Sequence, residues 1–134
     1  MFIQDVTGKV GIGTTNLSCT TCNDYRLFVK DGIKTEKIKV EIATTAGWAD
    51  YVFEKEYKLP TLKEVEKQIQ EKGHLADIPS AKEVVENGIE LGEMNKLLLQ
   101  KIEELTLYMI EQNKANEKQA KEIEELKMLV GKRN

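Results

Sequence analysis

Aromatic residues are scarce in this chain of 134 residues: three Phe, one Trp and four Tyr make up 6% of it. The length suits one ordinary domain, but so few large side chains can build only a small core. Most of the aliphatic residues instead fall in narrow strips along the sequence. We therefore expect other copies of the chain to supply part of the burial.

Three further shortages exclude classes of function. The formal net charge is -3. Because nucleic-acid binding requires a clustered basic face, we expect no nucleic-acid partner. No run of eighteen apolar residues occurs, so we expect no membrane insertion. His74 is the one histidine, and beside Gly73 it is better placed to close a helix than to act in a catalytic triad. We expect no enzymatic activity, no cofactor and no catalytic residue.

The two cysteines, Cys19 and Cys22, form the motif CTTC in a turn-like stretch. A redox motif would require a βαβ context, which the surrounding sequence lacks. Two thiolates per chain could also supply half of a tetrahedral zinc site. The preferred interpretation is a short structural disulfide, or a pair of free thiols, and no metal site.

Residues 1–58 are predicted to be β-rich. Asp31-Gly32 is a hairpin-type turn signal between two runs of β-branched and apolar residues. After that turn Ile38, Val40 and Ile42 alternate with charged residues, which predicts a strand with one apolar face. The segment WADYVF, residues 48–53, is predicted to form one more short strand.

Residues 59–90 are predicted to contain two short helices, each with a capping box. Thr61 with Glu64 begins the first helix, which ends at Gly73. Ser80 with Glu83 begins the second, and Asn87-Gly88 stops it.

Residues 91–134 are predicted to form a helix that is too long to bury its apolar stripe within one chain. About forty residues at 1.5 Å each make a rod of roughly 60 Å. The apolar spacing predicts a parallel coiled coil, with Glu122 at position g and Lys127 at the next e placed to pair between helices. Upstream, two successive four-residue steps, from Met94 to Leu98 and on to Ile102, indicate a stutter. The predicted association core comprises Leu98, then Ile102, Met109, Asn116, Ile123 and Val130 at position a, and Leu105, Gln112, Gln119 and Leu126 at position d.

Polar layers at Gln112, Asn116 and Gln119 weaken the middle of this seam but favour one alignment, because a misaligned partner leaves them unpaired. Ile at position a with Leu at d favours a dimer, whereas the Gln layers favour three strands. The alternative is a solvated surface helix whose polar layers are simply its outer face.

A glycine-broken strand, GKVGIGTTN, spans residues 8–16. Glycine permits a positive φ or a close backbone approach, so Val10 and Ile12 can point to an axis shared with neighbouring chains. The alternative is a glycine-rich loop. A phosphate-binding loop is disfavoured, because no Lys-Ser/Thr pair follows Gly13 and no helix starts there.

Trp48, Tyr51 and Phe53 are the densest aromatic group. They could form a platform for a sugar. The preferred interpretation is that they pack the strand region against the first capped helix, since the chain has few other large core residues.

Three longer stretches together resemble the C-terminal modules of phage tail-fibre-like and bacterial surface proteins. They are YRLFVKDGIKTEKIKV, GWADYVFEKEYKLPTLKEVEKQI and GHLADIPSAKEVVENGIELGEMNKLLLQKIEELTLYMIEQNK, which follow GKVGIGTTN in that order. The chain is similar to a short relative of the intramolecular chaperone domain of endosialidase-type tail fibres. One departure matters: Ser18 and Ser80 are followed by Cys19 and Ala81, so the Ser-Asp junction at which such chaperones release themselves is missing. We expect the purified chain to remain one piece.

The resemblance implies an elongated α+β homotrimer. Residues 1–58 would be an intertwined fibre-shaft segment, 59–90 a chaperone-like helical segment and 91–134 the trimerisation helix. The implied function is trimerisation and folding of an extracellular fibre, on a virion tail or a bacterial cell surface. The alternative is the receptor- or glycan-binding tip of a secreted adhesin.

Overall fold

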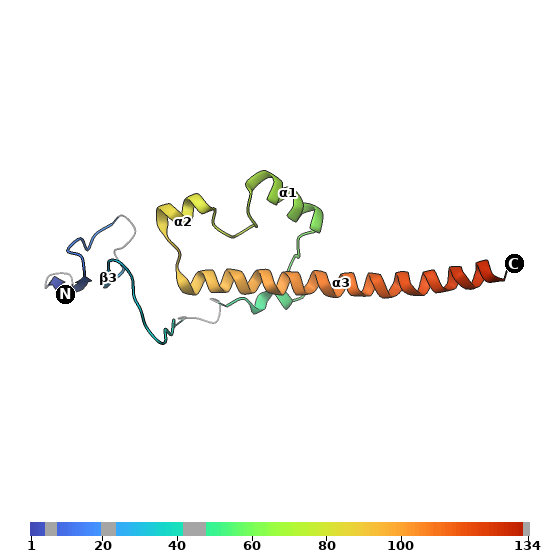
Figure 1. Cartoon of the computed structure of the whole chain (residues 1–134), viewed down its shortest axis with the longest axis horizontal. Helices are drawn as coiled ribbons and strands as arrows, with labels where there is room; N and C mark the ends of the chain where they lie inside the picture. The colour runs from blue at the N-terminus through green and yellow to red at the C-terminus, as the bar shows by residue number, and fades with distance from the viewer. Residues whose placement is uncertain (5–7, 20–23, 42–47, 133–134) are drawn as a thin grey trace. The chain divides into compact units, whose positions relative to one another are not determined.

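The structure, a computed structural model, describes residues 1–4, 8–19, 24–41 and 48–132 (Figure 1). The chain divides into two compact units, Met1–Lys39 and Val40–Asn134. The first unit holds three strands, and the second holds a 3-10 helix and three α-helices. The expected mixture of helix and a small sheet with a long C-terminal helix is confirmed.

The first unit is built on a three-stranded sheet in the order β1-β2-β3. β1 (Phe2–Gln4) pairs antiparallel with β2 (Lys9–Ile12), and β2 pairs parallel with β3 (Leu27–Val29). Lys30 N donates to Ile12 O at 2.9 Å and thereby extends the parallel pairing past β3.

Two glycines of GKVGIGTTN do what the sequence analysis expected of them. Gly13, where the chain leaves β2, has a φ of 71°. At Gly11 an added Cβ would lie 2.3 Å from Thr14 O and 2.9 Å from Leu17 Cδ2, so only glycine lets the following loop fold back across the strand.

The predicted hairpin is half right. Asp31 and Gly32 do form a turn with positive φ, at 72° and 113°. The second arm is wrong as a strand, because residues 33–41 form no regular structure. A strand needs a hydrogen-bonded neighbour, and no described segment of the chain lies against this one as a strand. Ile42, the last residue of the predicted alternation, lies outside the described residues.

The strand predicted at residues 48–53 is also wrong. Asp50–Phe53 forms a 3-10 helix, η2, in which Val52 N donates to Ala49 O at 3.1 Å. The short turn buries Ala49 and Val52 together, and η2 packs on the long C-terminal helix. Contact with that helix therefore decides the conformation here rather than the β-propensity of the aromatic residues.

Both capped helices are present with the expected first residues. α1 (Leu62–Lys72) follows Thr61, whose side chain accepts from Glu64 N while the Glu64 carboxylate accepts from Thr61 N at 2.7 Å. Gly73 ends α1 in the left-handed conformation. α2 (Ala81–Asn87) has the same reciprocal pair, Ser80 with Glu83, and ends before Gly88. Each capping box satisfies two backbone donors that would otherwise lack partners.

The long C-terminal helix, α3, spans Leu91–Gly131. From Met109 to Lys132 every residue is exposed. None of the described helices is both long enough and apolar enough to cross a membrane. Figure 1 shows α1 and α2 on one side of α3 and η2 on the other.

Candidate functional site

The first half of α3 carries two different stripes on opposite faces. At 3.6 residues per turn, the stripe of Gln100, Glu103 and Glu104 is centred about 180° from the stripe of Leu98, Ile102 and Leu105. The polar stripe is buried, whereas the apolar one is exposed. This is the reverse of the usual amphipathic pattern, in which a helix turns its apolar face to the core of its own chain.

The polar stripe is covered by η2 and the residues after it. Tyr51 Oη donates to Gln100 Oε1 at 2.6 Å, and Tyr57 Oη donates to Glu104 Oε1 at 2.5 Å. The rings of Tyr51 and Tyr57 lie 5.9 Å apart between their centroids. Gln100 Nε2 donates to the same Glu104 oxygen at 2.9 Å, which joins both tyrosines in one network. We call these four residues the polar clamp.

Glu104 is held in its charged form. Burial raises the pKa of Glu104, but hydrogen bonds from Tyr57, Gln100 and Lys101, together with the charge of Lys101, outweigh burial and lower the pKa below its ordinary value. Lys101 Nζ lies 3.0 Å from Glu104 Oε2 and also reaches Asp77 at 3.4 Å. Burial, and then the hydrogen bond to Glu104, raises the pKa of Tyr57. At neutral pH the Glu104 carboxylate therefore accepts a hydrogen bond from the neutral phenol of Tyr57.

Glu103 is buried without such partners. Its side chain is buried in the interface with η2, and Oε2 has no hydrogen-bond partner. Burial raises the pKa of Glu103, and the nearby charge of Asp50 raises it further. In the sequence, Glu103 and Glu104 beside Lys101 are typical of a solvated helix surface, yet both are buried. Their spacing of three and four residues from Gln100 shows only that the three residues share one face of α3.

The apolar stripe continues along α3 as the predicted a/d seam. We call the residues at these a and d positions, together with Leu98, the seam. Ile102 and Leu105 are each 60% exposed, and the polar layers in the middle of the helix are exposed as well. Gln112 Nε2 donates to Asn116 Oδ1 at 2.9 Å, so these two layers are linked along the helix. The seam comprises Leu98, Ile102, Leu105, Met109, Gln112, Asn116, Gln119, Ile123, Leu126 and Val130.

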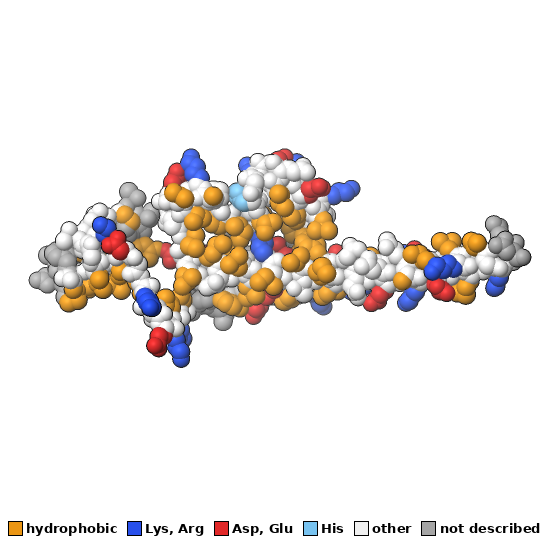
Figure 2. All heavy atoms as spheres, viewed as in Figure 1, with side chains coloured by type: hydrophobic (Ala, Val, Ile, Leu, Met, Phe, Trp, Pro, Cys, Tyr) orange, Lys and Arg blue, Asp and Glu red, His pale blue; other side chains and the backbone are white. Residues whose placement is uncertain are grey.

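Beside the seam lies an apolar hollow of about 440 Å³ between α1 and α3. Tyr108 on α3 donates to Pro60 O at 2.6 Å and fixes the start of α1 at one end of the hollow. Figure 2 shows the hydrophobic side chains gathered between α1, α2 and the first half of α3. The six apolar residues that line the hollow are Leu62, Val65, Leu75, Leu98, Ile102 and Leu105.

The sheet of the first unit also leaves an apolar face open. Val10 pairs with Leu27 and Ile12 with Val29, and paired residues of neighbouring strands point to the same face. Ile12 and Leu27 are exposed, and Val10 and Val29 are half-buried. Val10 and Ile12 thus lie on one open face, as the seam residues do on α3.

The opposite face of β2 is covered by its own chain. Lys9 is buried, its Nζ donates to Leu17 O at 3.0 Å, and it lies 5.2 Å from the centroid of the Phe28 ring. Leu17 is buried under Gly11. In both units, therefore, this chain covers a polar side chain and leaves an apolar stripe exposed.

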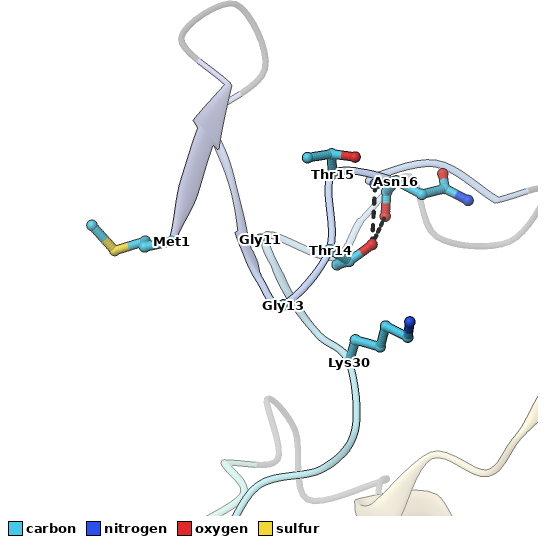
Figure 3. A pocket seen from close by; sticks show the side chains of 7 residues that line it. All are labelled: Met1, Gly11, Gly13, Thr14, Thr15, Asn16 and Lys30. Carbon is cyan, nitrogen blue, oxygen red and sulfur yellow. Dashed lines mark hydrogen bonds between the residues drawn. The ribbon is translucent and has the colours of Figure 1, made fainter.

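The loop after β2 is fixed by short-range bonds (Figure 3). Thr14 Oγ1 accepts from Asn16 N at 3.1 Å, which turns the chain back toward Leu17. The hollow beside this loop is open, and Lys30 is the one charged side chain among the described residues that line it. None of those described lining residues is a buried polar group aimed at a ligand.

The aromatic group is divided by its surroundings. Tyr51 belongs to the polar clamp, whereas Trp48 and Phe53 are exposed. Neither the sugar platform nor the packing of these residues against α1 is tested by this arrangement. Tyr51 and Tyr57 instead contact α3.

Cys19 is disulfide-bonded and therefore does not titrate as a thiol. Cys22, the other cysteine of the chain, lies outside the described residues. Among the described residues no group of three or more His, Cys, Asp or Glu side chains could hold a metal ion.

Comparisons with known proteins found no match to this chain among family models, curated proteins or solved structures. The resemblance to fibre modules accordingly stays a prediction from the sequence.

Proposed function

We propose that this chain is a self-associating structural module, in which the α3 helices of three copies form a parallel coiled coil. One observation carries the proposal: the buried stripe of α3 is polar and the exposed stripe is apolar. A solitary long helix gains little stability in water, so most helical stability comes from packing an apolar face. The exposed seam is the face that this chain leaves for that packing.

The small size of the internal core supports the same conclusion. Among the described residues the buried apolar side chains are Leu17, Ala49 and Val52. Ordering the backbone costs about 1–2 kcal/mol of conformational entropy per residue. Burial of apolar surface is the main contribution that offsets this cost. These three side chains supply little of that burial, which supports a contribution from association.

Parallel alignment is part of the proposal and is supported by charge. The apolar positions Ile123, Leu126 and Val130 return in phase with Ile102 and Leu105 after the polar layers. A parallel, in-register neighbour places each polar layer opposite its own copy. Glu122 and Lys127 then face each other across the interface at positions g and e. Ile at position a with Leu at d would favour a coiled coil of two helices. The Gln layers and the fibre resemblance favour three helices, and the proposal follows them.

The sheet is the second association surface. Val10, Ile12, Leu27 and Val29 share an apolar face of the first unit, on which Ile12 and Leu27 are exposed and Val10 and Val29 are half-buried. Ile33 and Ile38, which follow the sheet, are exposed as well. In the assembled fibre module, neighbouring copies would cover this face. The intertwined strands predicted from the sequence are part of the proposal in this form.

The proposed role is trimerisation and folding at the end of an extracellular fibre, such as a phage or phage-like tail fibre. Helices form from local contacts and associate quickly, whereas β-pairing between chains is non-local and slow. Association of α3 raises the effective concentration of the three sheet segments and sets their register. The module would act as an intramolecular chaperone without cleavage and without catalysis.

Two measurements on the purified chain test this function. Light scattering should give the mass of three chains, and a monomeric mass at all concentrations contradicts the proposal. Deleting residues 102–134 should lower the yield of heat-stable trimers, because the sheet segments then meet without alignment. Full-yield, heat-stable trimers from the truncated chain would rule out the chaperone role while leaving association itself intact.

A second candidate function is a receptor- or glycan-binding tip of a secreted adhesin. The observation that favours it is the exposure of Trp48 and Phe53, which flank the buried Val52. Exposed aromatic faces stack on sugars and bind partner proteins. Glycan-array binding that is lost in Trp48→Ala, with the mass and helix content unchanged, would favour this function. Binding that is absent in the parent chain or unaffected by the substitution would exclude Trp48 as the platform.

A further inference from the structure

Helix α1 has an apolar face that its own chain does not cover. None of its residues is buried, and Leu62 at its start is 60% exposed. The capping box and the hydrogen bond from Tyr108 to Pro60 fix where α1 begins, but they bury none of its apolar side chains. An eleven-residue helix is marginal in water without such burial.

The hollow beside α1 is open to the same partner that the seam requires. Its floor is formed by Leu98, Ile102 and Leu105, which are seam residues, and its wall by Leu62, Val65 and Leu75. A neighbouring helix that packs on Ile102 and Leu105 along the seam therefore also lies against the hollow. One occupant can cover both the floor and the wall.

We propose that the hollow receives α3 of a second copy, so that α1 of each chain clamps the α3 helix of its neighbour. The inference rests on the proposed coiled coil and adds an outer layer of α1 helices to it. Continuity supports a second copy as the occupant, since the floor of the hollow is the first part of the seam.

The physical chemistry of the hollow agrees with an apolar occupant. The hollow has a volume of about 440 Å³ and is lined mainly by apolar side chains. Lys101, Glu104 and Tyr108 are the polar members of its lining; Lys101 and Glu104 pair with each other, and Tyr108 is bonded to Pro60. Seam side chains of a neighbour would displace water from apolar walls, which is favourable.

Hydrogen exchange of the unmodified chain tests the clamp directly. We expect the amides of α1, residues 62–72, to be protected in concentrated samples and to exchange rapidly once dilution dissociates the assembly. Protection of α1 that does not change between the assembled and dissociated states would overturn the inference. This measurement requires no substitution, so a folding defect cannot imitate its result.

A paired substitution supplies the second test. Leu62→Ala with Val65→Ala removes wall side chains without altering the seam, and we expect the concentration at half-association to rise about tenfold or more. The matched control is Val85→Ala with Ile110→Ala, which removes two aliphatic side chains outside the hollow and should leave that concentration unchanged.

The outcomes separate the clamp from the proposed function. If the wall variant associates as the parent chain does, while Ile102→Ala weakens association, the clamp is wrong and the coiled coil stands. The hollow would then be open to a partner other than this chain. If the parent chain does not associate at all, the proposed function fails first and the clamp fails with it.

Discussion

Replacing Ile102 by alanine should weaken the assembly far more than the same loss of atoms elsewhere on α3. Ile102 occupies position a of the seam, lines the floor of the hollow and is 60% exposed in the single chain. Most of its burial therefore occurs on association rather than on folding. Ile102→Ala should change the stability of the assembly and leave the helix content of the single chain nearly intact.

The magnitude follows from that exposed fraction. Burying a whole Ile side chain contributes about 1.5–3 kcal/mol, so burying the exposed 60% contributes about 1–2 kcal/mol in each chain. A trimer loses this contribution three times, which is about 3–6 kcal/mol, or about 10²- to 10⁴-fold in the dissociation constant. Because three chains dissociate together, the concentration at half-association varies as the square root of that constant and should rise about 10- to 100-fold.

Sedimentation equilibrium over a wide dilution series measures this concentration. The matched control is Ile110→Ala, since Ile110 is 45% exposed and lies on α3 outside the seam. We expect Ile110→Ala to associate as the parent chain does. Equal half-association concentrations for the two variants would refute the assignment of the seam, and a larger effect of Ile110→Ala would place the interface on the other face.

Three further predictions concern folding within one chain. Tyr57→Phe should destabilise the contact between η2 and α3 by about 1–2 kcal/mol in urea unfolding, because a hydrogen bond to a charged group is lost at a partly exposed site. This loss should shrink as pH falls through the lowered pKa of Glu104, since the stability from a carboxylate with a lowered pKa is present above its ordinary pKa and disappears on protonation. Glu103→Gln should stabilise the chain at neutral pH, because the raised pKa of Glu103 means that its charged form is disfavoured in the folded state. The gain should be smaller in acid, where Glu103 itself is protonated. A destabilised variant at neutral pH would show that Glu103 has a partner. Gly11→Ala should lower the stability of the first unit by about 1–3 kcal/mol in thermal unfolding, because the new Cβ would lie 2.3 Å from Thr14 O, whereas Gly131→Ala, with open space around it, should not.

Local patterns in the sequence predicted local structure well. Thr61 with Glu64 and Ser80 with Glu83 place the first turns of α1 and α2, because a capping box involves residues only three apart. The exposed stripe of α3 was likewise predictable, since helical periodicity fixes which residues share a face. The roles of Gly11 and Gly13 also follow from glycine chemistry within a few residues of the chain.

Contacts between distant segments were not predictable in this way. Nothing in WADYVF indicates a 3-10 helix, because its conformation depends on packing against α3. The hydrogen bonds of Tyr51 to Gln100 and Tyr57 to Glu104 join residues separated by 49 and 47 positions. Glu103 and Glu104 resemble ordinary surface charges until η2 covers them.

The sequence by itself therefore determined α1, α2 and α3, the capping boxes of α1 and α2, and which residues share a face of α3. The tertiary structure alone decided which stripe the chain covers for itself. It covers the polar stripe, because the tyrosines that follow residue 50 bring hydroxyl groups that satisfy Gln100 and Glu104 on burial. Apolar side chains need no such matched donors, so the seam can remain open until another surface of the same kind removes it from water.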